Sequence, residues 1–190
     1  MGHDTDLIVY GTRQGQTARI VNEMTLILEA GGHDVDVHNL KESRPETLGV
    51  YDATIVAASV HAGGYEHEVR DWVRLHAAEF EVRPNAFVSV SLSAANDDAA
   101  SIAEMDAIIR RFCDSTGWEP GRVVRFAGAL VYSEYNWLLK RIMRTIVRKK
   151  EHGRYTDMTR DYEFTDFEEV RNFARDFGGV VWMISTASTI

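Results

Sequence analysis

The chain begins with an apolar run, followed by a loop of small and polar residues and then by a helical pattern. The run is Leu7 to Tyr10, the loop is Gly11 to Thr17, and apolar residues recur at helical spacing from Gln16 onward. Apolar runs and helical patterns alternate in this way along the chain. Strands are predicted over residues 6–10, 33–38, 53–59, 86–92 and 123–131. Helices are predicted over residues 16–30, 66–80, 99–116, 136–150 and 166–177.

This alternation predicts an α/β fold, because strands that alternate with helices build a doubly wound parallel sheet covered on both faces. Glycines follow three of the predicted helices, at Gly31-Gly32, Gly117 and Gly178-Gly179. We expect each to end its helix with a residue at positive φ. A length of 190 residues, 45% of them hydrophobic and 26% charged, fits a single domain over residues 1–190. An extended helical insert is expected at about residues 132–162, after the fifth strand.

The loop after the first strand, Gly11 to Thr17, has the composition of a phosphate site and is called here the phosphate loop. Its glycines allow positive φ, its hydroxyls and N–H groups can donate to phosphate oxygens, and the following helix contributes a partial positive charge. A Walker loop, G-x-x-x-x-G-K-[ST], and a dinucleotide fingerprint, G-x-G-x-x-G, are both absent at this position. The pattern [ST]-x-x-G-x-T from Thr12 to Thr17 resembles the FMN-phosphate loop of flavodoxins. A plain tight turn is the alternative that this motif alone leaves open.

Five strands and this loop predict the flavodoxin order 2-1-3-4-5, in which the ligand lies where the winding reverses. The loops after strands 1, 3 and 4 should then meet, and the small residues of the last two would let the backbone approach a flat ring. The candidate cofactor-binding residues are Thr12, Arg13, Gln14, Gly15, Gln16, Thr17, Ser59, Val60, His61, Ala62, Gly63, Gly64, Tyr65, Ser91, Leu92, Ser93, Ala94, Ala95 and Asn96. Tyr65 either stacks on an isoalloxazine ring or packs on a helix.

No side chain is predicted to be catalytic. His61 lies in a candidate flavin loop, but a lone exposed histidine usually faces solvent. The other histidines considered (His33, His38, His67 and His76) have no metal-site spacing, and no nucleophile with a base is evident. The chain has a single cysteine, Cys113, so an intramolecular disulfide is excluded. Cys113 is expected to be a buried structural thiol. The chemistry is therefore expected to belong to the cofactor.

The net charge of −8 is unevenly distributed. Residues 134–150 hold six cations and one anion, a charge of +5, which leaves −13 for the rest of the chain. The acidic remainder argues against nucleic acid as a partner, and the basic segment favours an anionic surface. The sequence shows no signal peptide at its start and no apolar run of about 20 residues. We therefore expect a cytoplasmic protein.

The basic segment also has the pattern of an amphipathic helix, with one apolar and one cationic face. At 1.5 Å per residue, residues 136–150 would span only about 22 Å, which suits a helix lying in a membrane interface. An ordinary helix that covers the protein's own core is the alternative. The candidate membrane-facing or quinone-facing residues are Trp137, Leu138, Leu139, Lys140, Arg141, Ile142, Met143, Arg144, Ile146, Val147 and Arg148.

Several stretches together resemble the bacterial menaquinone-dependent protoporphyrinogen IX dehydrogenase family of flavodoxin-like FMN proteins. They are Gly11 to Thr17, Ala57 to Val60, Ala86 to Leu92, Ala127 to Tyr132, and Tyr162 to Asp166. The resemblance runs from about Leu7 to Phe177. It implies an enzyme of heme biosynthesis that holds FMN and passes electrons from a reduced tetrapyrrole through the flavin to a membrane quinone. The basic amphipathic segment favours peripheral contact with the inner face of the cell membrane. The oligomeric state is left open.

Two segments depart from the pattern of that family. His61-Ala62 stands where the dehydrogenases have a basic residue followed by an aromatic one, and the loop over residues 94–99, with Asp97-Asp98, is shorter and more acidic. These departures affect the expected substrate contacts more than the expected cofactor. A flavodoxin-type electron carrier and a flavin-dependent quinone reductase fed by NAD(P)H are the alternative functions.

Overall fold

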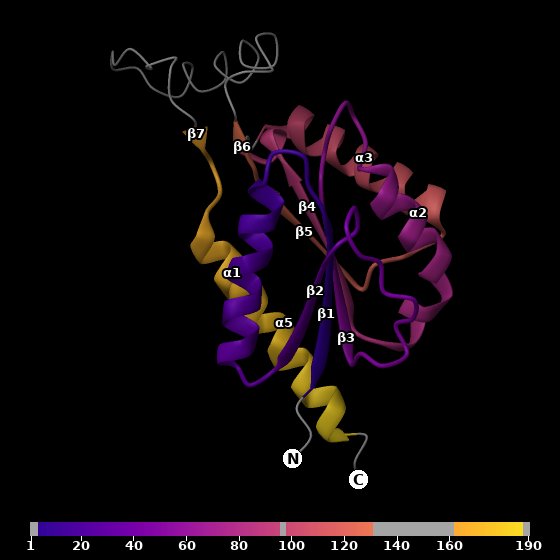
Figure 1. Ribbon diagram of the computed structural model, residues 1–190. Helices are drawn as coiled ribbons and strands as arrows, with labels where there is room; N and C mark the ends of the chain where they lie inside the picture. The colour runs from indigo at the N-terminus through magenta and orange to yellow at the C-terminus, as the bar shows by residue number, and fades with distance from the viewer. Residues whose placement is uncertain (1–3, 96–97, 131–161, 188–190) are drawn as a thin grey trace.

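A computed structural model describes residues 4–95, 98–130 and 162–187 of the chain. Its main sheet consists of five parallel strands: β1 (Thr5–Gly11), β2 (Asp34–Asn39), β3 (Ala53–Ser59), β4 (Asn85–Ser91) and β5 (Arg122–Ala127). The strands lie in the order β2-β1-β3-β4-β5 (Figure 1), which confirms the predicted doubly wound, flavodoxin-like sheet. The predicted helix over 136–150 and its candidate membrane-facing residues lie outside the described residues.

Helices cover both faces of this sheet. α1 (Gln16–Ala30) and α5 (Phe167–Ala187) lie together on one face, and α2 (His67–His76) and α3 (Ala99–Thr116) lie on the other (Figure 1). Two short 3₁₀ segments, η1 (Ala77–Val82) and η2 (Leu92–Ala95), follow α2 and β4. No described helix has the length and apolar character that crossing a bilayer requires.

The core consists of two apolar layers because side chains of a strand alternate between its two faces. Ile8 packs in the layer that holds Met24 of α1 and Phe173 of α5. Its neighbour Val9 packs in the layer that holds Trp72 of α2. Burial on both faces explains why β1 and β3 contain continuous apolar runs in the sequence.

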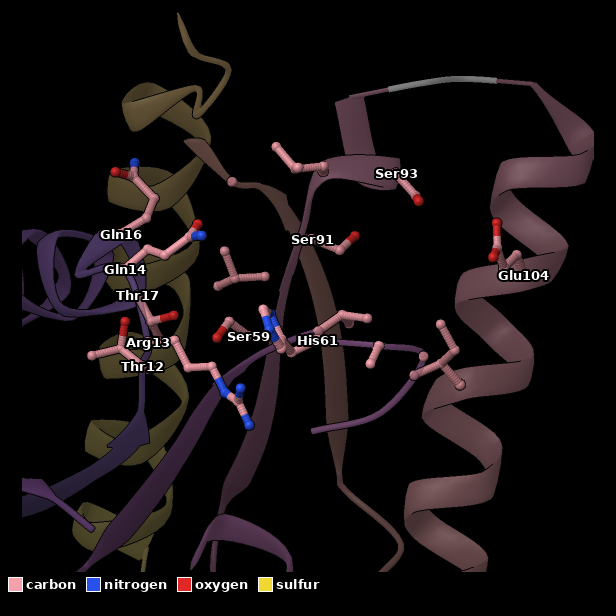
Figure 2. Close-up of a pocket in the computed structure, with 17 residues that line it drawn as sticks. Thr12, Arg13, Gln14, Gln16, Thr17, Ser59, His61, Ser91, Ser93 and Glu104 are labelled. Atoms are coloured by element: carbon pink, nitrogen blue, oxygen red, sulfur yellow. The ribbon is translucent and has the colours of Figure 1, made fainter. Parts of the chain in front are cut away.

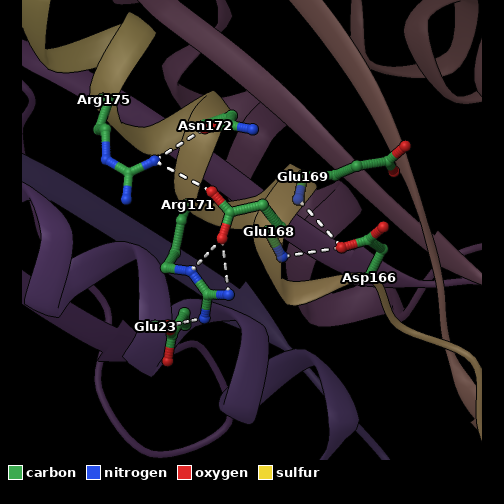
Figure 3. A network of polar contacts seen from close by, with 7 residues as sticks. All are labelled: Glu23, Asp166, Glu168, Glu169, Arg171, Asn172 and Arg175. Atoms are coloured by element: carbon green, nitrogen blue, oxygen red, sulfur yellow. Dashed lines mark hydrogen bonds and ion pairs between the residues drawn. The ribbon is translucent and has the colours of Figure 1, made fainter.

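Polar contacts tie the start of α5 to α1 (Figure 3). The carboxylate of Asp166 accepts hydrogen bonds from the backbone N–H groups of Glu168 at 2.8 Å and Glu169 at 3.3 Å. Arg171 bridges Glu168 and Glu23 of α1, at 2.9 and 2.8 Å. The carboxylate at the helix start satisfies N–H groups that the helix itself leaves unpaired, and this fixes where α5 begins.

Two predicted elements are shorter than expected. The fifth strand leaves the main sheet at Ala127, and residues 129–130 form β6 (Ala129–Leu130), which pairs antiparallel with β7 (Tyr162–Glu163). The predicted helix over 66–80 is α-helical only to His76. It tightens into η1, where Glu79 accepts a hydrogen bond from the Leu48 N–H at 2.9 Å.

The predicted helix end at Gly178-Gly179 was wrong, because α5 continues to Ala187. A Cβ atom on Gly178 would lie 3.0 Å from Nε2 of His33 and 3.1 Å from Cδ2 of Leu28. Gly178 therefore allows close packing of α5 against α1 rather than a turn. The other two ends are confirmed, since Gly32 and Gly117 have φ of 93° and 72° just beyond α1 and α3.

Candidate functional site

A cavity of about 390 Å³ opens at the carboxyl ends of β1, β3 and β4, where the strand order reverses (Figure 2). Its walls come from the three loops that the sequence predicted and from α3. The lining residues are Thr12, Arg13, Gln14, Gln16, Thr17, Ser59, Val60, His61, Ala62, Gly63, Val90, Ser91, Leu92, Ser93, Glu104, Ile108 and Gly128.

The phosphate loop forms one end of this cavity. Gly15 has a φ of 82°, its N–H donates to Oγ1 of Thr12 at 3.0 Å, and its carbonyl accepts the first hydrogen bond of α1, from the Arg19 N–H at 3.1 Å. Thr17, in the first turn of α1, is 1% exposed, and its hydroxyl has no hydrogen-bond partner among the described residues. A buried hydroxyl at a helix N-terminus suits a bound anion that accepts its proton.

Gln16 connects the phosphate loop to the far edge of the sheet. Its Nε2 donates to Oγ1 of Thr165 at 2.7 Å, and that hydroxyl donates to the carbonyl of Ala127 at 2.6 Å. The end of β5 and the segment before α5 therefore hold the start of α1 in place. Thr165 was quoted for the family resemblance but was not predicted as a site residue.

The loop after β3 is a tight turn beside the cavity. The N–H of His61 donates to the carbonyl of Gly64 at 2.7 Å, and the reverse bond is 3.0 Å long. The turn places Ala62 and Gly63 at φ of 48° and 78°. Arg111 of α3 also donates to the Gly63 carbonyl at 3.2 Å, so the turn is supported from the neighbouring helix.

Tyr65 lies in the core and not in the cavity lining. Its ring meets those of Phe87 and Phe112 edge to face, each at a centroid distance of 5.0 Å, and its hydroxyl lies 2.7 Å from Oγ of Ser89. Burial raises the pKa of the Tyr65 phenol. This placement supports packing rather than stacking on a flavin. Gly64 also lies outside the cavity lining.

The loop after β4 begins with a serine that shapes it. The Ser91 hydroxyl donates to Sδ of Met105 at 3.1 Å and accepts from the Ala94 N–H at 3.2 Å. Ser91, Leu92 and Ser93 line the cavity, whereas Ala94 and Ala95 do not. Asn96 lies outside the described residues.

Four lining residues were not predicted as site residues: Val90, Glu104, Ile108 and Gly128. Figure 2 shows Glu104 on the side opposite the phosphate loop. Glu104 and Ile108 lie one turn apart on α3 and line the cavity. Their i, i+4 spacing is the only sequence signal that could have placed them on a common face. Gly128 lies in the stretch after β5 that was quoted for the resemblance.

Cations lie around the outside of the phosphate loop. Nζ of Lys41 donates to the carbonyl of Thr12 at 3.1 Å. Arg13 lines both the main cavity and a neighbouring one of about 240 Å³, whose other lining residues are Lys41, Glu66, His67 and Glu68. These positive charges favour an anion in the loop.

The sheet order, the loop after β1 and a cavity at the switch point define a flavodoxin-like class of protein. A family model described as a flavodoxin domain matches residues 7–159. Oxidised flavodoxin 1 from Bacillus cereus superposes with a TM-score of 0.54 at 10% identity, over 92% of this chain and 97% of that one, which shows the shared fold.

Two curated relatives are more similar in sequence. The chain is 32% identical over 170 residues to protoporphyrinogen IX dehydrogenase [quinone] of Escherichia coli K12, covering 90% of this chain and 92% of the relative. It is 31% identical over 175 residues to the protein of the same name from Leishmania major, covering 92% of this chain and 74% of the relative. The chain therefore belongs to the flavodoxin-like oxidoreductase family of protoporphyrinogen IX dehydrogenases.

Proposed function

We propose that the chain is an FMN-dependent oxidoreductase that carries electrons from a reduced tetrapyrrole to a quinone. The observation that carries the cofactor proposal is the buried hydroxyl of Thr17 in the phosphate loop, which has no hydrogen-bond partner within the described ranges and lies at the switch point of the sheet. The substrate and the acceptor are proposed because the relatives are named as dehydrogenases of protoporphyrinogen IX that use a quinone. A bound flavin would accept two electrons from the substrate and release them to the acceptor.

Different residues of the cavity would bind different parts of this cofactor. Thr12, Thr17 and the backbone N–H groups at the start of α1 would bind the phosphate. The turn over residues 59–63 and the serines Ser91 and Ser93 would border the ring. Two of the predicted residues, Gly64 and Tyr65, would support the turn from behind rather than contact the ring.

The phosphate site is tested by removing one hydroxyl without changing the side-chain shape. Thr17→Val should weaken FMN binding roughly tenfold to a hundredfold, because a hydrogen bond to a charged group contributes about 1.5–3 kcal/mol. The matched control is Thr25→Val on the same helix, whose hydroxyl donates to the carbonyl of Val21 at 3.0 Å and not into the cavity. Flavin fluorescence during titration gives both dissociation constants. Equal affinities for the two variants would place the phosphate elsewhere.

The redox partners are tested with the flavin-loaded protein under anaerobic conditions. Protoporphyrinogen IX should bleach the flavin absorbance, and a menaquinone analogue should restore it. Bleaching by a reduced protein carrier but not by the porphyrinogen would favour an electron carrier. Rapid bleaching by NAD(P)H alone would favour a quinone reductase.

A further inference from the structure

Glu66 is a buried carboxylate that is hydrogen-bonded to Ser59, a lining residue of the main cavity. It precedes α2, is 3% exposed and lines the smaller cavity. Its Oε1 accepts a hydrogen bond from Oγ of Ser59 at 2.6 Å. Its Oε2 is buried without a hydrogen-bond partner among the described residues and lies 3.3 Å from where a Cβ atom on Gly11 would stand.

The contact between Glu66 and Ser59 fixes the direction of a hydroxyl that lines the main cavity. A serine hydroxyl has one proton to donate and two lone pairs to accept with, whereas a carboxylate only accepts. Because the proton of Ser59 is directed at Glu66, the side of Oγ that remains for a ligand can only accept. Figure 2 shows Ser59 between the phosphate loop and His61, in the part of the cavity away from Glu104.

We propose that Glu66 is a positioning residue that makes Ser59 an obligate hydrogen-bond acceptor toward the bound flavin. The ligand group opposite Ser59 must then be an O–H or N–H donor, which the ribityl chain and the ring of a flavin both provide. The inference rests on the proposed function for the identity of the ligand. It assigns to Glu66, which lies outside the lining of the main cavity, a role in selecting how the flavin is held.

The surroundings of Glu66 give a physical reason for this arrangement. Glu66 is a buried carboxylate with one oxygen that finds no partner in the part of the chain that the structure describes, and such burial is costly, so its position is hard to explain by packing alone. Gly11 leaves the space beside Oε2, because a Cβ atom there would lie 2.6 Å from Cγ2 of Val69 and 3.3 Å from the carboxylate. The end of β1, the end of β3 and the start of α2 thus converge on one hydrogen bond at the edge of the cavity.

The test compares Glu66→Leu, which removes the hydrogen-bond acceptor of Ser59, with Glu66→Gln, which removes only the charge. Glu66→Leu removes the acceptor and should weaken FMN binding about threefold to tenfold, because Ser59 can then turn its proton into the cavity. Glu66→Gln keeps a carbonyl oxygen for Ser59 and should bind FMN as the parent chain does. If the Gln variant is weakened as much as the Leu variant, the charge of Glu66 matters rather than its hold on Ser59, and the proposal is overturned.

A double-mutant cycle checks that the effect passes through Ser59. Ser59→Ala should weaken binding by a similar factor, and adding Glu66→Leu to it should cause no further loss. Additive losses would show that Glu66 acts by another route and would overturn the proposal. Far-UV circular dichroism and melting curves identify any misfolded variant, and Glu66→Gln and Ser59→Ala remain informative if Glu66→Leu does not fold.

Riboflavin separates this inference from the proposed phosphate site. It lacks the phosphate, so Thr17→Val should not change its affinity, whereas the coupling between Glu66 and Ser59 should persist. A parent chain that binds neither flavin would refute the proposed function itself. If the parent chain binds flavin and substitution of Glu66 or Ser59 leaves the flavin affinity unchanged, only the inference is refuted.

Discussion

At the scale of single residues, Asp6 is a buried carboxyl whose ionisation opposes folding. It is buried in β1, where loss of hydration, followed by the charges of Asp4 and Asp52, raises its pKa from 3.8 to about 7. The ring Nδ1 of His33 lies 3.0 Å from Oδ2 of Asp6, but the contact lacks hydrogen-bond geometry. We therefore expect the folded chain to hold the Asp6 carboxyl protonated up to nearly neutral pH.

This raised pKa predicts a stability that falls with rising pH. Between about pH 4 and 7 the folded state keeps the Asp6 proton and the unfolded state has lost it, so unfolding is favoured as the pH rises. Asp6→Asn cannot ionise and should flatten this slope, making the variant more stable than the parent at pH 8 by up to a few kcal/mol. Urea unfolding at pH 5 and pH 8 measures both slopes. A less stable variant at pH 8 would mean that His33 keeps Asp6 ionised in the fold.

Residues whose roles are local could be predicted from the sequence, and those whose roles depend on distant partners could not. The phosphate loop was predicted because Gly15 and Thr17 lie in one continuous stretch after a strand. Tyr65 could face either way from the sequence, and in the structure its hydroxyl is hydrogen-bonded to Ser89 on β4. Cys113, expected to be buried, is half-buried against the aromatic cluster around Phe112, and burial raises the pKa of its thiol.

At the scale of elements, the two adjacent glycines of α5 have different surroundings and provide a matched pair of variants. In Gly179→Ala the added Cβ atom has no other atom within 4 Å. This variant should stabilise the fold by about 0.5–1 kcal/mol, because alanine favours the helix more than glycine does. Gly178→Ala has the same helical preference but must displace His33 and Leu28, so it should be at least about 1 kcal/mol less stable than Gly179→Ala. Denaturant unfolding of both variants measures the difference. Equal stabilities would show that α5 and α1 can separate without cost.

The elements were predictable to the extent that their signals are local. Both faces of β1 and β3 are buried, so continuous apolar runs located these strands well. The end of α5 was misjudged because a glycine can serve either a positive φ or a close approach, and only the packed structure distinguishes them. The end of β5 was misjudged because residues 129–130 leave the main sheet and pair with β7, which lies more than 30 residues further along the chain.

At the scale of the whole molecule, the order of strands brings three loops to one edge, and this is why a sequence pattern could predict most of the cavity. The doubly wound order requires the loops after β1, β3 and β4 to lie at the same end of the sheet. The wall from α3 was missed, because nothing in the pattern indicated that Glu104 and Ile108 face this cavity. Thr165 was missed as a site residue because its partner Gln16 lies 149 residues earlier in the chain.

The charge distribution of the chain leads to a last prediction, which concerns residues 134–150 and rests on the sequence. We propose that this basic segment, at +5 against −13 elsewhere, binds an anionic membrane surface. Liposome binding should require acidic lipid and weaken as salt shortens the Debye length below about 10 Å. The triple variant Arg141→Glu, Arg144→Glu and Arg148→Glu should lose binding sharply, because each cation contributes about 1 kcal/mol near such a surface.

Replacing the apolar side of the same segment separates a membrane helix from a core helix. The triple variant Leu139→Ser, Met143→Ser and Val147→Ser should release the protein from liposomes with little change in melting temperature if these side chains insert into lipid. If they are instead buried in the protein, the melting temperature should fall steeply, because each lost aliphatic group costs on the order of a few kcal/mol. The membrane proposal would be refuted by a steep fall in the melting temperature of this variant, together with a parent chain that does not bind acidic liposomes at low salt. The flavin titrations of the same variants serve as the control, since the proposed cofactor residues lie on other segments and FMN affinity should stay at the parental value.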